Sequence, residues 1–356
     1  MKRKKVLIFA SEISGYNVAC FNCIAEQYDL TVSYFDKDKS SLPCKFIKKH
    51  LPSKKIGHFV MIKGARKMAK QFDVVCFPPD LHFISYWGLV FLPKHFKTID
   101  WGIGFRVSYK HPYLVYRKHS LLDWFSKIIQ NRCDASIFYM EQAKEFWKDT
   151  NFRMEKIFVA INTTDVFPIS IDTEEKKEIL FVGTLYKGKG LDKLLEVYSE
   201  LASQVNNPPR LTIVGDGSER SKLENYVNEH KLGDFVCFKG AIYDEKQLAL
   251  CFEKALLCIS PYQAGLSVLK SMGYGVPFVT MKTAITGGEI YNIKNGENGI
   301  MYDKDDDLLQ ILLEANSNPG KYINMGIKAK EYYDNNATVK HQANSFMEAI
   351  EYSIKS

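Results

Sequence analysis

Short apolar runs alternate with longer amphipathic stretches along the whole chain. In the first half, residues 6–10 and 135–139 are apolar runs of strand length, and residues 114–130 have the spacing of a helix. The same alternation begins again at residue 178 and continues to residue 281, after which helical spacing dominates. Short buried strands that alternate with helices are typical of parallel sheets with helices on both faces. The pattern therefore predicts an α/β protein with two doubly wound, Rossmann-like domains that face a cleft.

A polar, acidic segment at residues 164–177 interrupts the pattern between the two series. It predicts a linker, with domains over residues 1–165 and 178–335 and a C-terminal helix over 336–356 that is a candidate to pack back on the N-terminal domain. Within the first domain, apolar residues recur every three or four positions from 56 to 72 and predict a helix there. Ligands of such sheets bind beyond the carboxyl ends of the strands, so chemistry is expected in the loops that follow them.

The composition of the chain excludes several classes of protein. Of its 356 residues, 46% are hydrophobic and 25% are charged, as in ordinary soluble globular proteins. This excludes disordered and collagen-like chains, and no apolar run approaches the ~18 residues of a membrane span. The apolar run at residues 6–10 is also shorter than the roughly 7–15 residues of a signal-peptide core. We therefore expect a cytoplasmic protein, with the inner face of the cell membrane as a candidate place of action.

Positive charge is concentrated in the first half. The net charge is +7, but residues 1–170 hold 27 Lys and Arg against 15 Asp and Glu, whereas residues 171–356 hold 21 against 26. Residues 40–72 contain nine Lys or Arg and no acidic residue. The aromatic interleaving of a nucleic-acid-binding module is missing, so no nucleic acid partner is expected. The stretch is interpreted either as a face that contacts an anionic membrane or as a solvated basic surface.

Two patterns resemble metal sites and are interpreted otherwise. Cys20 and Cys23 form a C-x-x-C, but no second pair of Cys or His completes a zinc set. Asp303, Asp305 and Asp307 resemble an Asp-x-Asp site, yet they directly precede an apolar helical stretch, where acidic residues stabilise a helix N-terminus. We therefore predict buried thiols in a helix, an acidic helix N-terminus, and no metal ion or other cofactor.

Four glycine turns in the second half each follow a predicted strand. The first, around Gly183 and Gly190, carries two lysines at the start of a helix, which suits a phosphate group as well as an ordinary turn. The second, around Gly215, has a capped strand–helix turn as its alternative, with Ser218 as the cap. The third, at residues 240–242, offers backbone groups to a flat base.

The fourth turn has the composition of a diphosphate site. A helix is expected to begin near Gly265, so that its unpaired amide groups point into the predicted cleft. Ser267 adds a hydroxyl group, and Lys270 adds a positive charge one turn further on. We therefore expect this loop to bind a diphosphate.

In this order, the turns resemble the donor-binding domain of glycosyltransferase family 4, which has the GT-B fold. The last part is most similar to a bacterial subgroup that assembles surface polysaccharides such as capsule and O-antigen. The first half matches more loosely, through W-G-I-G at 101–104 and the strand that begins at Asp134. The motifs are F-V-G-x-L-x(3)-K-G at 181–190, V-G-D-G at 214–217, F-x-G at 238–240, S-P-x(3)-G-L at 260–266, G-x-P at 275–277 and G-G-E-x(3)-I-x-N-G-x-N-G at 287–299.

The resemblance implies transfer of a sugar from a nucleotide diphosphate sugar to an acceptor hydroxyl group. Lys189 corresponds to the lysine that family members aim at the donor phosphates. Glu289 is retained, and its candidate roles are catalysis through the hydroxyl groups of the donor sugar or simply capping of a helix. The residues that correspond to the diphosphate-capping amides are Gly265, Leu266 and Ser267. The other donor-side candidates are Gly183, Thr184, Lys187, Gly215, Gly240, Ala241, Ile242, Tyr262 and Lys270, and the acceptor-side candidates are Gly15, Ile103 and Gly104.

The chain departs from the family on the donor side. The Glu-x(7)-Glu pair that commonly spans the fourth loop is Tyr262 and Lys270 here. The second glutamate normally holds the ribose, and a lysine cannot accept hydrogen bonds from its hydroxyl groups. The arginine expected after Gly183 is Thr184, although Lys187 is a candidate to supply the lost charge.

The acceptor side departs as well. The subgroup usually has W-G-H-G, and its histidine is Ile103 in this chain. An isoleucine can neither bond to a sugar nor shuttle charge. His111 and His119 are nearby in the sequence and are weaker candidates for that role.

The sequence as a whole predicts a retaining, metal-independent hexosyltransferase that builds a bacterial surface glycan. Its N-terminal domain is expected to bind a glycan or lipid-linked acceptor, and both UDP and GDP sugars are candidate donors. The departures motivate an alternative, a nucleotide-sugar or glycan-binding relative that has lost catalysis. A third possibility is an unrelated two-domain Rossmann enzyme such as an epimerase.

Overall fold

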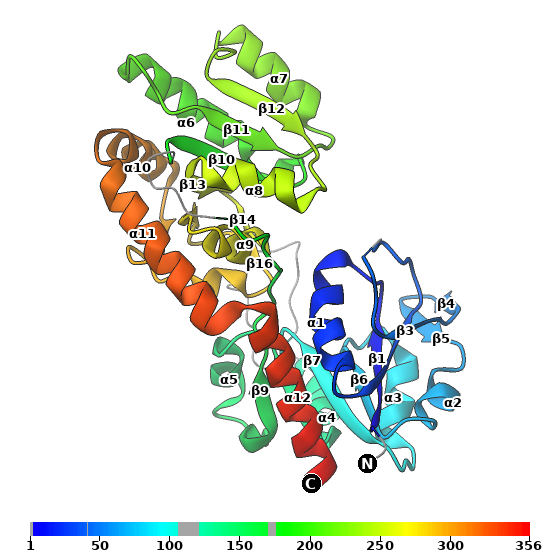
Figure 1. Cartoon of the computed structure of the whole chain (residues 1–356). Helices are drawn as coiled ribbons and strands as arrows, with labels where there is room; N and C mark the ends of the chain where they lie inside the picture. Colours follow the sequence, from blue (N-terminus) through cyan, green and yellow to red (C-terminus); the bar gives the residue numbers. More distant parts are fainter. Residues whose placement is uncertain (1–2, 41, 106–120, 170–175) are drawn as a thin grey trace. The chain divides into compact units, whose positions relative to one another are not determined.

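The computed structural model describes residues 3–40, 42–105, 121–169 and 176–356. The chain divides into two compact units (Figure 1). The first contains the described residues up to Thr164 together with Val339–Ser356, and the second contains those of Asp165–Thr338. The predicted linker at 164–177 begins at this boundary, and its residues 170–175 lie outside the described ranges. Each unit has its own parallel sheet with helices packed on it, so the chain is an α/β protein with two Rossmann-like domains, as predicted.

The sheet of the first unit is parallel throughout and follows the order β3-β2-β1-β6-β7-β8-β9. Successive side chains of its apolar strands enter opposite faces. Val6 and Ile8 of β1 belong to one core, whereas Leu7 and Phe9 belong to the core on the other face. The strands are β1 (Lys5–Ala10), β2 (Asp29–Tyr34), β3 (Ile47–His50), β6 (Val74–Phe77), β7 (Lys97–Gly102), β8 (Ala135–Phe138) and β9 (Ile157–Val159).

Helices from both ends of the chain cover one face of this sheet. Phe21 of α1 and Phe346 of α12 each contact Trp101 of β7 edge-on, with centroid distances of 6.2 and 5.5 Å. The C-terminal helix therefore completes the core of the first unit, next to α1 in Figure 1. The helices of this unit are α1 (Gly15–Ala25) and α12 (Val339–Lys355) on this face, α2 (Ala65–Ala69), α3 (Ile84–Phe91) and α4 (Leu121–Arg132) on the other, and α5 (Gln142–Trp147) after β8.

The predicted helix over residues 56–72 is wrong. Strands β4 (Ser53–Ile56) and β5 (Phe59–Ile62) form an antiparallel hairpin there, and only the short α2 follows. The hairpin turns at Gly57, whose φ of +59° suits a tight turn, and Gly64 with φ of +79° separates β5 from α2. Glycines at these two positions favour turns over a continuous helix, and they outweigh the helical spacing of the apolar residues.

The same region holds two elements that the sequence pattern does not predict. β3 is mostly charged and lies at the edge of the sheet, where burial imposes little alternation. α3 is apolar almost all round and therefore lacks the polar face that marks a surface helix. In the hairpin, Ile56 and Phe59 are 45% and 42% exposed, whereas Ile62 is buried.

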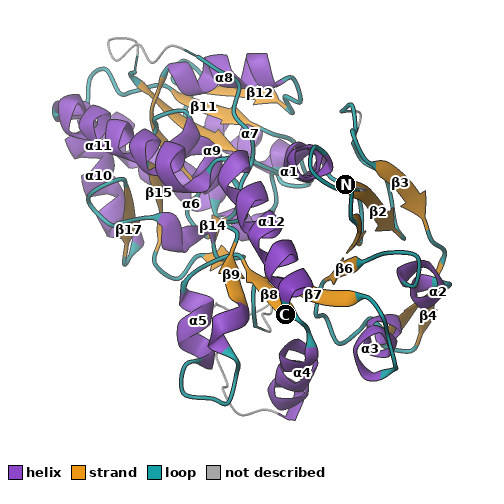
Figure 2. Ribbon diagram, turned by 60° about the horizontal axis from the view of Figure 1, so that its bottom comes forward, coloured by secondary structure: helices purple, strands orange, loops and turns teal. Residues whose placement is uncertain are grey.

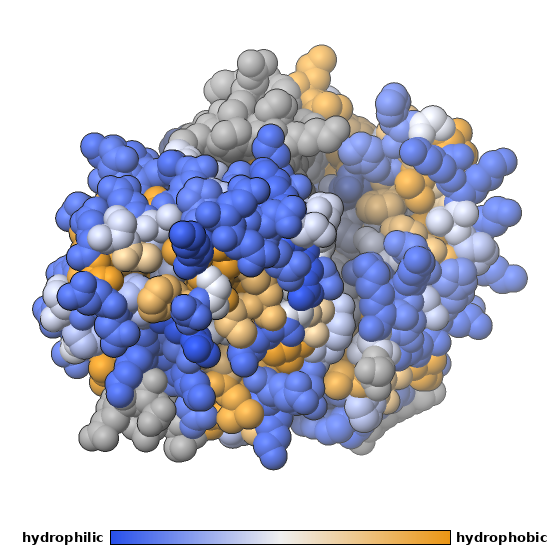
Figure 3. All heavy atoms as spheres, turned by 90° about the horizontal axis from the view of Figure 1, so that it is seen from above, coloured by the Kyte–Doolittle hydropathy of each residue, from blue (hydrophilic) through white to orange (hydrophobic). Residues whose placement is uncertain are grey.

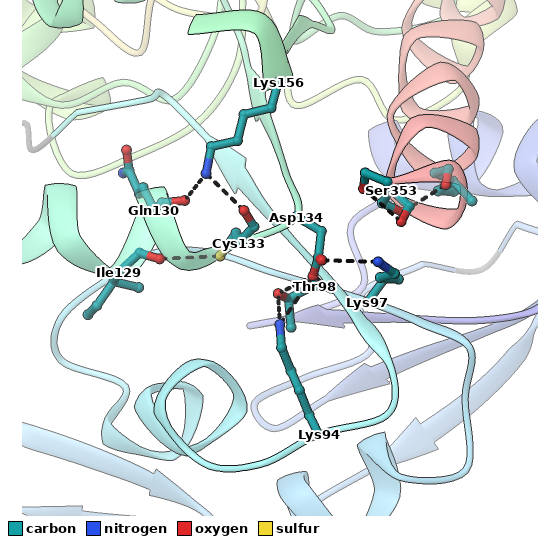
Figure 4. A network of polar contacts seen from close by, with 11 residues as sticks. Lys94, Lys97, Thr98, Ile129, Gln130, Cys133, Asp134, Lys156 and Ser353 are labelled. Carbon is teal, nitrogen blue, oxygen red and sulfur yellow. Dashed lines mark hydrogen bonds and ion pairs between the residues drawn. The ribbon is translucent and has the colours of Figure 1, made fainter. Parts of the chain in front are cut away.

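A buried lysine holds the end of α4 against the strands that follow it (Figure 4). Nζ of Lys156 donates to the carbonyl oxygens of Gln130 at 2.7 Å and Cys133 at 2.8 Å. Helix C-termini leave carbonyl groups unpaired, and a positive charge is favourable there. Next to it, Asp134 accepts a hydrogen bond from the backbone N–H of Thr98 at 2.8 Å. These contacts fix how α4 leads into β8 and β9.

The sheet of the second unit is also parallel and follows the order β12-β11-β10-β13-β15-β17. Its strands are β10 (Glu178–Val182), β11 (Leu211–Val214), β12 (Val236–Gly240), β13 (Ala255–Ile259), β15 (Phe278–Met281) and β17 (Gly299–Tyr302), and a separate short pair is formed by β14 (Gln263–Ala264) and β16 (Ile285–Thr286). Its helices are α6 (Leu191–Gln204), α7 (Arg220–Glu229), α8 (Glu245–Glu253), α9 (Ser267–Gly273), α10 (Asp305–Ser317) and α11 (Pro319–Tyr332). The predicted alternation of strands and helices is confirmed in this half.

Within the described ranges, none of the helices combines the length and the hydrophobicity that a bilayer crossing requires. Figure 3 shows one face of the molecule, on which hydrophilic residues predominate and apolar residues occur in small groups.

Candidate functional site

Three of the four glycine turns meet at the carboxyl edge of the second sheet. They follow β10, β11 and β12, which are neighbours in that sheet. The amide of Gly183 donates to the carbonyl of Val214 at 3.0 Å, and the amide of Gly215 donates to the carbonyl of Gly240 at 2.8 Å. A Cβ atom on Gly215 would lie 1.8 Å from the Gly183 oxygen, so only glycine permits this approach. Turns that are far apart in the sequence thus form one continuous strip of backbone, from which Ala241 and Ile242 lead on toward α8.

Ser218 does not cap the helix after the second turn, contrary to the prediction. α7 begins at Arg220 with Glu219 in the capping position, and no side chain accepts a capping hydrogen bond. The amide of Glu219 donates instead to the carbonyl of Leu185 at 3.0 Å. The backbone of the neighbouring turn therefore takes the place of the expected side-chain cap, because helix N-terminal amides can donate to any well-placed oxygen.

Lys189 lies against this strip, and its ammonium group has no acceptor among the described residues. It ends the short 3₁₀ helix Lys187–Lys189 and is 9% exposed. A Cβ atom on Gly183 would lie 3.4 Å from its Nζ, and none of the hydrogen bonds or ion pairs among the described residues involves that atom. Burial lowers the pKa of Lys189, while the nearby Cys258 and Glu289 act in the opposite direction. A buried ammonium group without an acceptor favours the binding of an anion. Lys187 and Thr184, on the same loop, are exposed.

The fourth turn presents an unpaired hydroxyl group. α9 starts at Ser267, and the amide of Val268 already bonds to the carbonyl of Gly265 at 2.9 Å. The amides of Leu266 and Ser267 therefore lie at the helix N-terminus, where intrahelical acceptors are missing. Oγ of Ser267 is buried and has no hydrogen-bond partner in the described part of the chain. Nothing in the structure lies within 4 Å of the position of a Cβ atom on Gly265, so the loop is open to a ligand at that point.

Tyr262 joins the first turn to the fourth. Its ring packs on Gly190, where a Cβ atom would lie 2.6 Å from the ring, and Gly190 has a φ of +73°. The Tyr262 amide donates to the carbonyl of Lys189 at 3.4 Å, and its hydroxyl group donates to Asp305 at 3.2 Å. Burial and the neighbouring Asp305 raise the pKa of Tyr262 to about 12, so the hydroxyl keeps its proton. Tyr262 therefore fixes the loop that carries Lys189.

Lys270 forms an ion pair that the sequence analysis missed. Its Nζ contacts the two carboxylate oxygens of Glu245 at 2.7 and 2.6 Å. Glu245 is the first residue of α8, in the loop region that follows the third turn. The available signal was a lysine within an otherwise apolar helical stretch, because a cation in such surroundings needs an acceptor or a charge partner. The structure thus places a carboxylate next to the position where the family has the second glutamate of its pair.

Glu289 is buried in the loop that follows β16. Its Oε2 accepts hydrogen bonds from Oγ1 of Thr286 at 3.2 Å and from the amide of Gly287 at 2.9 Å. β16, which directly precedes this loop, pairs with β14 of the fourth turn, and the amide of Tyr262 in that turn donates to the carbonyl of Lys189. The structure therefore brings Glu289, Lys189 and the fourth turn into one region of the second unit.

The acceptor-side candidates lie at the carboxyl edge of the first sheet. Gly15 begins α1 after β1, and Ile103 and Gly104 follow β7. Gly104 has a φ of +94°, and a Cβ atom there would lie 2.7 Å from Phe138, so glycine is required. Its carbonyl accepts a hydrogen bond from Nε1 of Trp147 at 2.8 Å, which fixes the loop. His111 and His119 lie outside the described residues.

The acidic cluster that resembles a metal site is the N-terminal turn of α10. Asp307 accepts hydrogen bonds from the amides of Asp303 and Lys304, at 3.2 and 3.1 Å. Asp303 pairs with Lys282 at 2.7 Å. In the described part of the chain, no three Cys, His, Asp or Glu side chains are grouped to hold a metal ion. Among the thiols of the C-x-x-C, that of Cys20 is buried in α1, and burial raises its pKa.

Known proteins resemble mainly this half of the chain. Residues 162–332 match the family described as Glycosyl transferases group 1. An uncharacterised glycosyltransferase of Haemophilus influenzae is 27% identical over 204 residues, 56% of each chain. The α-1,4-N-acetyl-D-galactosaminyltransferase of Campylobacter jejuni, named for a GalNAc-containing acceptor on PP-undecaprenol, is 22% identical over 200 residues, 56% of this chain and 54% of the relative. The chain thus spans about half the length of the curated relatives it matches.

Solved structures resemble the whole chain. The Anabaena protein HepE in complex with UDP has a TM-score of 0.70 and 16% identity, over 98% of this chain and 99% of that chain. At this identity the similarity concerns the fold, and the structures that cover both chains almost completely are GT-B glycosyltransferases. The matched range contains all the donor-side residues described above. Residues 162–332 therefore match the glycosyl transferases group 1 family, on a chain that has the GT-B fold.

Proposed function

We propose that this protein transfers a hexose from a UDP-sugar to a hydroxyl group of a glycan or lipid-linked acceptor, with retention of the anomeric configuration. The observation that carries the proposal is that one unit holds two donor groups without an acceptor among the described residues, the ammonium group of the largely buried Lys189 and the buried hydroxyl group of Ser267. Both are donors, and both are built into loops at the carboxyl end of the sheet. A diphosphate leaving group supplies the missing acceptors.

The roles of the donor-side residues follow from their chemistry. Lys189, Ser267 and the amides of residues 265–267 would hold the diphosphate and stabilise the charge that develops as the sugar leaves. The backbone of residues 240–242 would receive the base. Glu245, held by Lys270, would accept hydrogen bonds from the ribose hydroxyl groups, a role that Lys270 itself cannot perform. Glu289 would bond to hydroxyl groups of the donor sugar.

The choice of a UDP-sugar is supported by HepE, the structural neighbour whose complex contains UDP. The choice of a polymeric or lipid-linked acceptor is supported by the Campylobacter enzyme, whose name contains PP-undecaprenol. On this basis we assign the protein to glycosyltransferase family 4 and to synthesis of a bacterial surface polysaccharide such as capsule or O-antigen. Its first unit, with Gly15, Ile103 and Gly104, would bind the acceptor, and its basic stretch would contact the anionic inner face of the membrane.

The second candidate function is binding of a nucleotide sugar or a glycan without catalysis. Three replacements favour it. Ile103 stands where the family that this chain resembles has a histidine, and Tyr262 and Lys270 stand where that family has two glutamates. Tyr262 is moreover engaged in packing on Gly190 and in a hydrogen bond to Asp305. Under this alternative, the donor site would bind UDP-sugars and leave them intact.

Release of UDP from a panel of UDP-sugars separates the two functions. The wild-type protein should release UDP slowly by hydrolysis, and faster when an acceptor glycan is added. Lys189→Ala should reduce both rates, and Lys187→Ala, on the exposed part of the same loop, is the matched control. Proton NMR of the product then reports the anomeric configuration. Tight UDP-sugar binding with no UDP release above background would support the binding function and contradict the transferase.

A further inference from the structure

A row of aromatic rings runs across the β4–β5 hairpin, α3 and α4. Phe59 packs edge-on against Trp87 with ring centroids 5.9 Å apart, and Trp87 packs edge-on against Phe125 at 5.2 Å. Phe91 stacks on Phe125 at 6.3 Å. Figure 2 shows α3 between α4 and β4, so the rings connect three elements of the first unit into one surface.

Large apolar side chains on this surface are open to solvent. Leu121 and Trp124, on the first turn of α4, are 84% and 58% exposed. An exposed group of such residues usually marks a contact with another molecule, whereas single ones do not. We define the apolar patch as the exposed members of these elements and their ends: Ile56, Phe59, Phe91, Leu92, Leu121, Leu122 and Trp124.

The same elements carry positive charges without acidic partners. Within the basic stretch, Lys45 pairs with Glu26 and Lys48 pairs with Asp38. The basic residues on the hairpin, beside α2 and on α4 take part in no ion pair among the described residues. We name them the basic set: Lys54, Lys55, Lys63, Lys67, Lys127 and Arg132. The structure thus separates the neutralised lysines of the stretch from those that lie beside the apolar patch.

We propose that the apolar patch and the basic set together dock on the surface of an anionic lipid bilayer. Protein surfaces that lie in the membrane interface typically combine Trp, Phe and Leu with Lys and Arg. The apolar side chains enter the boundary between headgroups and acyl chains, and the charged side chains contact the headgroups. The uncompensated positive charge is complementary to anionic lipid. The inference deepens the membrane contact in the proposed function by naming the residues that make it.

The structure also changes the nature of that contact. A helix over 56–72 would have turned its apolar residues inward and left a purely electrostatic surface. The hairpin instead exposes Ile56 and Phe59, and the ring contacts of Phe59 with Trp87 and of Trp87 with Phe125 connect it to α4, whose Trp124 is also exposed. Binding should therefore have two components, one that salt screens and one that resists salt because it depends on apolar burial.

Sedimentation with vesicles tests the charge component, using the full chain without donor or acceptor. We expect the protein to sediment with phosphatidylglycerol vesicles at low salt and to remain in the supernatant with phosphatidylcholine vesicles. The triple variant Lys54→Glu, Lys55→Glu, Lys63→Glu should bind at least about tenfold more weakly. A control triple with the same change in net charge, Lys328→Glu, Lys340→Glu, Lys355→Glu, alters exposed lysines elsewhere and should bind like the wild type.

Salt resistance and tryptophan fluorescence test the apolar component. The double variant Ile56→Ser, Trp124→Ser should sediment at low salt but be released at high salt, whereas the control Leu250→Ser, Ile327→Ser on the second unit should behave like the wild type. Trp101 and Trp147 are buried, whereas Trp87 is half-buried in the aromatic row, so lipids with brominated chains should quench Trp124 most and Trp87 less. Trp124→Phe should therefore remove the larger part of this quenching, and Trp87→Phe the remainder.

The proposal is overturned if the wild type ignores anionic vesicles at low salt, or if the control triple loses as much binding as the test triple. It is also overturned if a soluble polyanion or an acidic protein binds with the same affinity and neither apolar substitution matters. UDP binding by the second unit is measured separately, so failure of membrane binding is distinguished from failure of the proposed transferase.

Discussion

Lys270 and Glu245 form an ion pair in which the ammonium group of one contacts both carboxylate oxygens of the other, at 2.7 and 2.6 Å. The side chain of Lys270 is 11% exposed, whereas that of Glu245 is 53% exposed. The lysine therefore acts as a buried anchor, and the carboxylate keeps lone pairs that face solvent and can accept further hydrogen bonds.

The ion pair predicts that the contributions of Lys270 and Glu245 to the free energy of unfolding depend on each other. Lys270→Ala should lower the free energy of unfolding by about 1–3 kcal/mol, less than for a fully buried pair because Glu245 is half exposed. The swap of Lys270→Glu with Glu245→Lys should recover most of the loss.

Glu245→Gln should weaken UDP binding more than binding of 2′-deoxy-UDP, measured by calorimetric titration. An unchanged ratio of the two affinities would remove Glu245 from the ribose site.

Lys189 is expected to dominate the affinity for nucleoside diphosphate. Its side chain is largely buried, and its ammonium group has no acceptor among the described residues, so a phosphate oxygen would gain a charge-assisted hydrogen bond there. Lys189→Ala should weaken UDP binding by roughly 1.5–3 kcal/mol, and Lys187→Ala, which removes an exposed charge, by less than about 1 kcal/mol. Titration calorimetry of both variants measures the difference. Equal losses would show a general effect of charge and no specific phosphate contact.

Ser267 offers a test that separates binding from stability. Because its hydroxyl group has no partner, Ser267→Ala should leave the unfolding free energy of the unliganded protein unchanged or slightly raised. UDP binding should weaken by about 0.5–1.5 kcal/mol, the scale of one hydrogen bond. The matched control is Ser271→Ala, since Oγ of Ser271 donates to the buried carbonyl of Val276 at 2.8 Å. That variant should lose stability and keep its affinity for UDP, and the opposite pattern would contradict the assignment.

Nucleotide binding should not depend on a divalent metal ion. Lys189, Ser267 and the amides of residues 265–267 would balance the diphosphate charge by themselves. We expect a chelator to leave UDP affinity unaltered, and Asp307→Ala to lower the melting temperature through the lost capping contacts without affecting UDP binding. Binding that disappears with chelator and returns with Mn²⁺ or Mg²⁺ would reassign the acidic cluster.

Asp100 predicts a pH dependence of stability. It is fully buried in β7, its Oδ1 accepts a hydrogen bond from Ser136 at 2.6 Å, and its Oδ2 has no partner. Burial raises the pKa of Asp100 to about 6, so the folded state holds this proton more tightly than the unfolded chain. The contribution to stability is therefore present at low pH and lost as the pH rises from about 4 to about 6.

Asp100→Asn removes this titration. Relative to the wild type, its unfolding free energy should rise by on the order of 2–3 kcal/mol between pH 4 and pH 7. Asp134 is the control of opposite sign: although burial raises its pKa, hydrogen bonds from Thr98 and the charge of Lys94 lower the pKa of Asp134 overall. Asp134→Asn should therefore lose stability relative to the wild type as the pH rises. Denaturant unfolding at several pH values measures both, and a difference between D100N and wild type that is independent of pH would contradict the prediction.

The sequence by itself determined the fold class and most of the second unit. Buried parallel strands must be apolar along their length, and glycine turns must follow them where backbones approach closely. Both features can therefore be predicted from the local sequence, without knowing which residues lie next to them in space. Gly183, Gly215 and Gly240 are of this kind, and the close approach of the Gly183 oxygen explains why residue 215 is glycine. The acidic N-terminus of α10 was likewise predictable, since helix ends select their residues locally.

Only the tertiary structure decided which side chains meet. The hairpin at residues 53–62 has helical spacing of apolar residues, but Gly57 and pairing between β4 and β5 override it, because strand pairing joins positions that local periodicity does not compare. Glu245 is 25 residues from Lys270 in the sequence, and its local sequence indicates only the start of a helix. Charge partners and exposed apolar surfaces depend on distances through space, and these arise only when the elements pack.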